Sequence, residues 1–246
     1  MTARIKAVTF DFWQTLVEDS PENLAKQRAR RIDEIARALE RSGCRLSGPE
    51  VEAAYERSER VLDERFWSRD RDPLIADQVR LVLDIAAPGI CTGLEPAHLQ
   101  EAVTGYIEPV LHFPPDLHPG AAEAVNGLAA RGIALGIVSN TGRTPGIVLR
   151  QILERYDLLR HFSVISYSDE VGYRKPDPEI FRQTLAKLGA EARHAAHVGD
   201  NPVADVTGAQ GAGMRGVHLA AGGRAPAAHA DVVVTDLRHL VDRILA

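Results

Sequence analysis

Four short polar motifs contain the residues of this chain whose types and spacing suit chemistry. In chain order they are Asp11 with Thr15, Ser139-Asn140, Lys175-Pro176, and Gly199-Asp200 with Asp205. Carboxylates that converge in one cleft repel each other unless a cation neutralises them. Hard oxygen ligands beside a phosphate favour Mg²⁺ as that cation.

The remaining residue types of these motifs suit phosphoryl chemistry. A carboxylate such as Asp11 is a competent nucleophile for forming an aspartyl-phosphate. Ser139 and Lys175 can hold the other phosphoryl oxygens, the lysine as a point charge. The motifs therefore predict a magnesium-assisted reaction on a phosphorylated small molecule, provided that the fold brings them together.

Short apolar runs precede these motifs and are expected to be strands. Helical patterns alternate with such runs from His118 onward, which is typical of βαβ units and a parallel sheet with helices on both faces. In open parallel sheets ligands bind at the carboxyl ends of the strands, where three of the four motifs begin. We predict an α/β fold with a doubly wound parallel sheet whose strands cover residues 5–10, 133–138, 162–165, 195–198, 216–219 and 232–234.

The segment between the first strand and the rest of the sheet has an almost wholly helical pattern. Ser20-Pro21 is a helix start and Gly43 a stop, and Ser47-Gly-Pro-Glu50 is a capping box. A third helix is expected from Pro73 to about Pro88, and a fourth from 95 to about 112. We predict a helical bundle over 18–115, inserted into an α/β core formed by 1–17 and 116–246.

Composition excludes several classes of protein. The net charge of −5 argues against a nucleic-acid-binding surface, and no apolar run approaches the roughly 20 residues of a membrane span. The N-terminus lacks the pattern of a signal peptide, and two distant cysteines favour a reducing, cytoplasmic location. Nothing in the sequence specifies an oligomeric state. The basic cluster at Arg28, Arg30 and Arg31 is interpreted as a solvated helix face.

Two further patterns are given structural interpretations. His194 and His197 have ligand-like spacing, but His197 falls within a predicted buried strand, so we expect a satisfied core histidine. The run from Gly211 to Gly216 matches G-x-G-x-x-G but precedes a strand, which is the wrong context for a dinucleotide site.

The ordered motifs resemble those of the haloacid dehalogenase-like hydrolase superfamily, and the resemblance covers the whole chain. Residues 11–16, Ser139-Asn140, Lys175-Pro176 and the segment from Gly199 to Asp205 look like the first to fourth motifs. The helical insertion looks like the family's cap.

The resemblance implies a role for each motif residue. Asp11 would be the nucleophile, Thr15 would support its loop, and Ser139, Asn140 and Lys175 would bind the phosphoryl group. The Mg²⁺ ion would be held by Asp11, Asp200, the backbone carbonyl of Trp13, and Asp205 directly or through water.

Trp13 is the main departure from the family pattern. Similar phosphatases carry a second aspartate there, which protonates the leaving group and later activates water. An indole is no acid near neutral pH, and general acid–base catalysis contributes roughly 10²–10⁴-fold. We therefore expect a slow phosphatase.

Two alternatives stay open at this point. A 2-haloacid dehalogenase-type hydrolase would also have a bulky aromatic residue at position 13, but it needs no metal, and Asp200 with Asp205 argues against it. A catalytically weak binding or regulatory protein would explain Trp13, but intact Asp11, Ser139 and Lys175 argue against that. A phosphonate hydrolase would need a cap lysine, and the insertion contains only Lys26.

Overall fold

The computed structural model describes residues 4–245, and its central element is a six-stranded parallel sheet. The strand order is β5-β4-β1-β6-β7-β8. The strands are β1 (Ala7–Phe10), β4 (Ala134–Ser139), β5 (Val164–Tyr167), β6 (Ala195–Gly199), β7 (Arg215–Leu219) and β8 (Val232–Val234). The predicted doubly wound α/β fold is confirmed, and each predicted strand overlaps an observed one.

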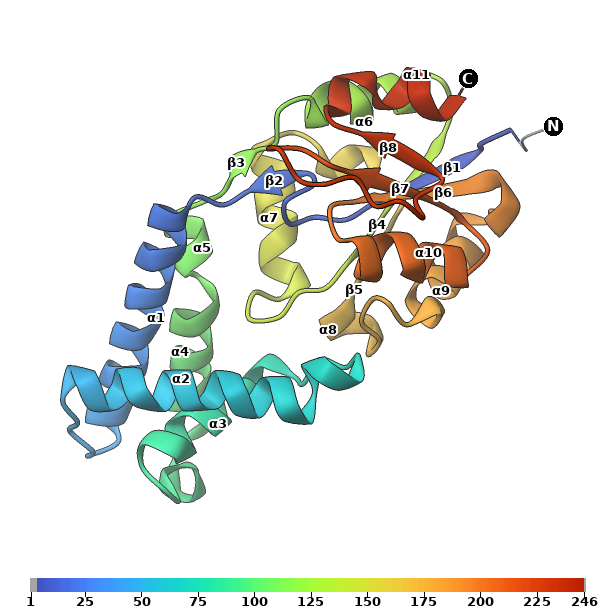
Figure 1. Cartoon of the computed structure of the whole chain (residues 1–246). Coiled ribbons are helices and arrows are strands. Elements are labelled where there is room, and N and C mark those ends of the chain that lie inside the picture. The colour runs from blue at the N-terminus through green and yellow to red at the C-terminus, as the bar shows by residue number, and fades with distance from the viewer. Residues whose placement is uncertain (1–3, 246) are drawn as a thin grey trace.

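Helices cover both faces of this sheet (Figure 1). One face packs against α6 (Ala121–Ala129), α7 (Gly146–Arg155) and α11 (Leu240–Leu245), and the other against α9 (Pro178–Leu188) and α10 (Gly208–Gly211). Successive side chains of a strand point to opposite faces, so Val8 and Phe10 enter the first core while Ala7 enters the second. Burial on both faces explains why the strands are continuously apolar.

The helical insertion lies between β1 and α6 and contains five α-helices. They are α1 (Pro21–Arg41), α2 (Gly48–Arg65), α3 (Ile75–Ala86), α4 (Pro96–Ile107) and α5 (Pro109–His112). Ser20 caps α1 by accepting from Asn23 N–H, and Ser47 with Glu50 forms the expected capping box. The insertion has its own apolar core, centred on residues such as Leu39, Val79 and Tyr106.

A two-stranded antiparallel ribbon, which the sequence did not predict, joins the insertion to the sheet. It pairs β2 (Val17–Glu18) with β3 (Asp116–Leu117). The chain leaves the core through β2 and returns through β3, so both connections lie side by side (Figure 1). Strands of two residues carry no recognisable periodicity, which is why local pattern missed them.

Two expectations about the insertion were wrong in detail. The fourth helix breaks at Glu108, because Pro109 has no N–H to continue the hydrogen-bond ladder. Arg31 is not on a solvated face: it is 7% exposed and donates to the Tyr106 carbonyl and to Thr144 Oγ1 in the core. Arg28 fits the prediction better, since it pairs with acidic side chains of α2 at the surface.

Among residues 4–245, no helix is long and apolar enough to cross a membrane.

Candidate active site

Three of the predicted motifs meet because their strands are neighbours in the sheet. Asp11 follows β1, Ser139 ends β4 and Asp200 follows β6, and β1 lies between the other two strands. Asp11 N–H donates to the Val198 carbonyl (2.9 Å), which continues the β1–β6 ladder to the edge. The carboxyl edge of the sheet therefore holds Asp11, Ser139 and Asp200 together.

Lys175 reaches this edge from the loop between α8 (Ser168–Val171) and α9. Its Nζ lies 2.7 Å from Asp11 Oδ1 and 2.5 Å from Asp205 Oδ1, and the side chain is almost fully buried. Burial alone lowers the pKa of a lysine, but the two carboxylates more than offset it and raise the pKa of Lys175. Lys175 is thus a cation held between two carboxylates.

Asp205 is the most completely bonded carboxylate of the site. It lies on a π-helical turn (Pro202–Thr207), and π-turns occur often at functional sites. Its Oδ1 accepts from Lys175 and lies 3.1 Å from His197 Nε2, and its Oδ2 accepts from Asn201 N–H. Burial by itself raises the pKa of Asp205, but Lys175 and His197 together hold it far below the usual range.

Asp205 approaches the end of β6 so closely that position 199 must be glycine. A Cβ at position 199 would lie 2.1 Å from Asp205 Cγ, so no other residue fits without moving that carboxylate. His197 completes the arrangement from β6, with its Nδ1 2.8 Å from Thr9 Oγ1. It is the satisfied core histidine that the sequence predicted, and burial lowers its pKa.

Asp200 lacks the lysine partner that its two neighbours share. Desolvation raises the pKa of Asp200 to about 7, and the nearby charges of Asp11 and Asp205 add to this effect. Arg224 pairs with it at 3.0 Å from a more exposed position. Carboxylate oxygens of Asp11, Asp200 and Asp205 all lie within 4.8 Å of one another.

This excess of negative charge fits a divalent cation. Oxygen-only donors at one edge are the ligand type that Mg²⁺ takes. A bound cation would relieve the repulsion that keeps the pKa of Asp200 high. Asp11 and Asp200 retain oxygens for a cation, whereas each oxygen of Asp205 already has a protein partner.

Two buried hydroxyls of the site, Ser139 Oγ and Thr15 Oγ1, have no well-formed hydrogen bond within residues 4–245, although Ser139 lies near the Asp11 carboxylate and opposes the rise that burial causes in the pKa of Asp11. Both residues are 0% exposed. A buried polar group without a partner costs about 1–3 kcal/mol, so such a hydroxyl is available for a ligand that supplies oxygen atoms. This is the expected state of a phosphoryl-binding Ser139.

Asn140 joins two of the motifs directly. Its Nδ2 donates to the Lys175 carbonyl (3.0 Å), and its Oδ1 accepts from Lys175 N–H (2.8 Å). The amide therefore fixes the backbone of Lys175 through both its oxygen and its nitrogen. The structure places Asn140 as a support for the lysine.

Trp13 stands in the turn between β1 and β2, where it is partly buried against the core and lies edge-on to Phe12. Gln14 follows with a φ of +56°, a left-handed conformation that is uncommon for a residue with a side chain. Trp13 and Gln14 thus both lie in the turn that follows Asp11, and neither side chain is an acid.

Sequence reasoning missed two residues at the boundary between the insertion and the core. Arg143 lies among Tyr55, Trp67 and Tyr106 of the insertion, and its NH1 donates to the Tyr106 hydroxyl. Its Nε and NH2 are buried without a partner in the part of the chain that the structure describes. Asp72 is the second missed residue. No local pattern distinguishes either from a surface charge.

The family profile of the haloacid dehalogenase-like hydrolases matches residues 5–213 of this chain. A phosphoserine phosphatase from Thermus thermophilus is 37% identical over 150 residues, which cover 60% of this chain and 58% of that protein. A phosphoglycolate phosphatase from Rhodospirillum rubrum is 38% identical over 109 residues, covering 42% of this chain and 44% of that protein. The chain therefore matches only about half the length of these relatives.

Among solved structures, the chain is similar to the 2-haloacid dehalogenase from Pseudomonas syringae pv. Tomato DC3000. The TM-score is 0.72, the sequence identity is 27%, and 97% of each chain is covered.

Proposed function

The chain belongs to the haloacid dehalogenase-like hydrolases, and from this membership we propose that it is a magnesium-dependent phosphatase of small phosphorylated metabolites. The observation that carries the proposal is Asp200, a carboxylate beside the proposed nucleophile, whose pKa is raised to about 7 by burial and by the negative charges of Asp11 and Asp205. A dehalogenation site that works without metal has no need of this third carboxylate beside Asp11 and Asp205. We further propose a cytoplasmic location for the reaction.

The proposed metal site consists of Asp11, Asp200 and the backbone carbonyl of Trp13. When bound there, Mg²⁺ would neutralise negative charge on the phosphoryl group and the carboxylates. We assign Asp205 to the water-mediated position, because Lys175, His197 and Asn201 N–H already occupy its oxygens. Its direct role is to hold Lys175 between the carboxylates.

The proposed reaction has two steps. In the first, an oxygen of Asp11 attacks phosphorus, the ester P–O bond breaks, and an aspartyl-phosphate forms while the leaving oxygen takes a proton from water. In the second, water hydrolyses the aspartyl-phosphate, which releases inorganic phosphate and restores Asp11. Lys175 and the free hydroxyl of Ser139 hold the phosphoryl oxygens in both steps, and Thr15 supports the nucleophile loop. The missing acid at Trp13 makes the first step the slow one for poor leaving groups.

Arg143 favours a substrate that carries a second anionic group. Its unpaired Nε and NH2 form the guanidinium edge that binds a carboxylate through two parallel hydrogen bonds. The loop that begins at Ser139 also carries Arg143, so a phosphate and a carboxylate would be bound by one segment. Phosphoserine and phosphoglycolate, the compounds named for the two relatives, are both phosphate monoesters with a carboxylate.

We also propose that the helical insertion, 18–115, acts as a cap over the core formed by 1–17 and 116–246. Its two connections run through one short ribbon, which allows it to move as a unit. A cap of this kind selects small substrates over folded phosphoproteins.

A dehalogenase is the second candidate function, favoured by the structural similarity to a 2-haloacid dehalogenase and by the aromatic Trp13. The two candidates are tested together by measuring phosphate release from a panel of esters and chloride release from 2-chloropropionate. Each assay is run with Mg²⁺ and with chelator, and Asp11→Asn is the inactive control. Phosphate release that needs Mg²⁺ supports the phosphatase, and chloride release that survives the chelator supports the dehalogenase. The absence of both activities supports a binding protein.

A further inference from the structure

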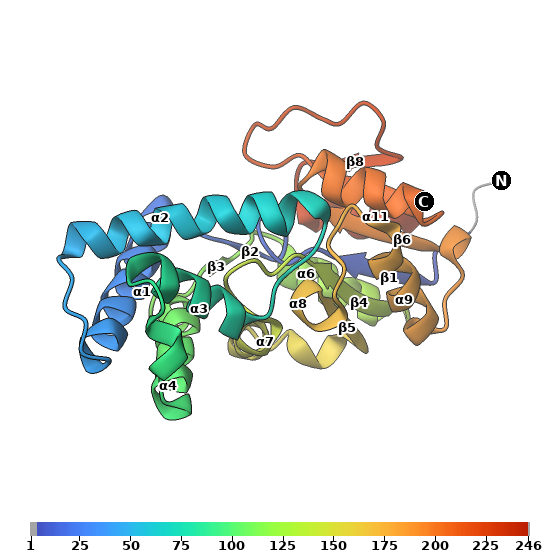
Figure 2. The same cartoon turned by 90° about the horizontal axis from the view of Figure 1, so that it is seen from below.

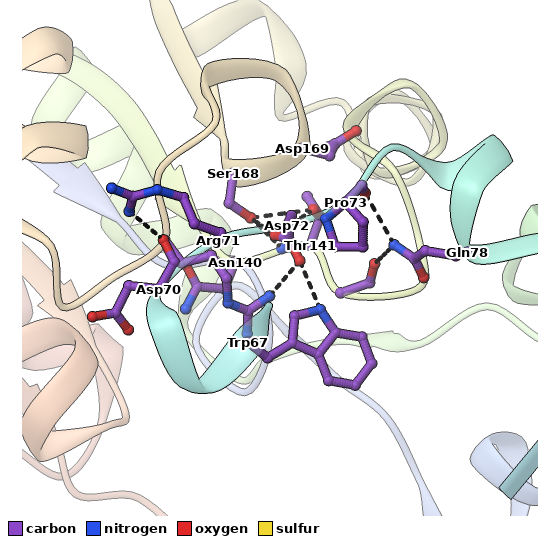
Figure 3. A network of polar contacts seen from close by, with 12 residues as sticks. Trp67, Asp70, Arg71, Asp72, Pro73, Gln78, Asn140, Thr141, Ser168 and Asp169 are labelled. Carbon is purple, nitrogen blue, oxygen red and sulfur yellow. Dashed lines mark hydrogen bonds and ion pairs between the residues drawn. The ribbon is translucent and has the colours of Figure 1, made fainter. Parts of the chain in front are cut away.

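Asp72 is a buried carboxylate in the connection between α2 and α3 of the insertion, and its side chain is 0% exposed. Within the insertion it accepts from Trp67 Nε1 at 2.9 Å. From the core it accepts from Arg174 NH1 (2.6 Å), from Ser168 Oγ, and from Thr141 Oγ1 (3.4 Å). Figure 3 shows Trp67, Thr141 and Ser168 around Asp72, each on a different segment of the chain.

The core partners of Asp72 adjoin both proposed phosphate-binding loops. Thr141 follows Ser139-Asn140, and its N–H donates to Ser168 Oγ (2.9 Å), which in turn donates to Asp72. Arg174 immediately precedes Lys175. One carboxylate of the insertion thus contacts the loop that holds Ser139 and the loop that holds Lys175.

Hydrogen bonds to backbone carbonyls also join the insertion to the core on both sides of Asp72. Arg174 N–H donates to the Asp70 carbonyl (3.0 Å), and Gln78 Nε2 donates to the Gly142 carbonyl (2.9 Å). The segment that carries them lies at the core end of α2, away from the β2–β3 ribbon (Figures 1 and 2). The insertion is therefore attached to the core here as well as through the β2–β3 ribbon.

The negative charge of Asp72 strengthens the hydrogen bonds that it accepts from the core. Hydrogen bonds to an ionised group are roughly twice as strong as those between neutral groups. A buried carboxylate with several donors also has few alternative arrangements, because any displaced donor would be left buried without a partner. The Ser139 loop and the Lys175 loop are consequently both held by the same carboxylate of the insertion.

We propose that Asp72 is a positioning residue that sets the relative placement of the Ser139–Asn140 loop and Lys175 when the insertion is seated on the core. This inference rests on the proposed function, because the two loops matter jointly only for holding a phosphoryl group. A displacement of about 1 Å at such groups can cost on the order of 10²-fold in rate.

The test compares Asp72→Asn, which keeps the size of the side chain and removes its charge, with Arg71→Ala as the matched control. Arg71 is the adjacent residue and contacts the Lys175 loop, through Asp177 at 3.2 Å and through the Tyr173 ring, but it is about half exposed and does not bridge to the Ser139 loop. Exposed ion pairs contribute little to stability because water screens them. Amide hydrogen exchange and steady-state phosphatase kinetics are measured on both variants.

We expect Asp72→Asn to speed exchange at the Thr141 and Lys175 amides, to lower kcat/KM by about 10- to 100-fold, and to weaken inhibition by inorganic phosphate. Arg71→Ala should leave all three within about threefold. A purely structural clamp would instead lower the melting temperature of Asp72→Asn while leaving kcat/KM of the folded enzyme and loop exchange unchanged, and that result overturns the proposal.

Failure of the proposed function is a separate outcome. If the unmodified protein releases no phosphate with Mg²⁺, the phosphatase proposal fails. Faster exchange at both loops in Asp72→Asn, with no change in Arg71→Ala, still supports the positioning role, whereas unchanged exchange overturns it whatever the activity.

Discussion

Replacing Asp200 with asparagine should stabilise the protein without metal and destabilise it with metal. In the metal-free state the ionised carboxylate of Asp200 is unfavourable, since burial and the charges of Asp11 and Asp205 raise its pKa from 3.8 to about 7. Asparagine has a similar size and carries no charge. If Asp200 binds Mg²⁺, the same substitution removes a ligand, so the sign of the effect must depend on the metal.

The magnitude follows from the size of the pKa shift. A shift of about 3 units corresponds to about 4 kcal/mol at 1.36 kcal/mol per unit. Asp200 is partly exposed and pairs with Arg224, so solvent screening and loss of this ion pair reduce the gain to about 1–2 kcal/mol. For a chain of this length, that gain raises the melting temperature by about 2–8 °C.

The pH dependence of this gain has a definite sign. Because the pKa of Asp200 is raised in the folded state, the natural protein binds an extra proton between about pH 4 and pH 7 and loses stability as pH rises through that window. The stability advantage of Asp200→Asn in chelator should therefore be smallest near pH 4 and largest above pH 7.

Magnesium should reverse the order of the two proteins. A ligand at 100 times its dissociation constant stabilises the folded state by about 2.7 kcal/mol, and Asp200→Asn should lose most of this. The assay is thermal unfolding in EDTA and in excess Mg²⁺ at several pH values. Asp236→Asn is the control, because Arg238 lowers the pKa of that surface carboxylate to about 2, so its neutralisation should not stabilise the protein in either condition. If Asp200→Asn is less stable than the natural protein in EDTA at pH 8, or gains as much from Mg²⁺, the reasoning is wrong.

Three further substitutions test the proposed chemistry. Asp11→Asn should abolish phosphate release in an ester assay while circular dichroism stays unchanged, and full turnover by this variant would exclude Asp11 as nucleophile. Lys175→Met should lower kcat/KM at least about 100-fold, and it should reduce the free energy of unfolding by about 3–5 kcal/mol because it leaves Asp11 facing Asp205 without a cation. Urea unfolding measures the second effect, and an unchanged free energy of unfolding would contradict the proposed charge arrangement. Trp13→Asp should speed alkyl phosphates by up to roughly 10²–10⁴-fold and flatten the dependence of rate on leaving-group pKa; no gain across a leaving-group series would refute the missing-acid argument.

Local sequence determined the strands, most helices and the order of the motifs. The apolar runs, the capping residues such as Ser20 and Ser47, and the stop at Gly43 act over a few residues, so their consequences can be predicted without a fold. The convergence of Asp11, Ser139 and Asp200 was also predictable. A parallel sheet has one carboxyl edge, and motifs that follow its strands must meet there.

Tertiary structure alone decided which charges found partners. Arg31 and Asp72 are charged residues of the insertion that look solvent-exposed by pattern. Both are buried, and residues more than 65 positions away supply most of their hydrogen-bond partners. The same holds for Asp205, which the sequence offered as a metal ligand and which the fold surrounds with Lys175 and His197. The physical reason is that hydrogen bonding and desolvation depend on distances between atoms, which spacing along the chain does not specify. The types and the order of the motif residues, from Asp11 to Asp205, can be read from the sequence. The ionisation and the position of each side chain are set by contacts that form only when the chain folds.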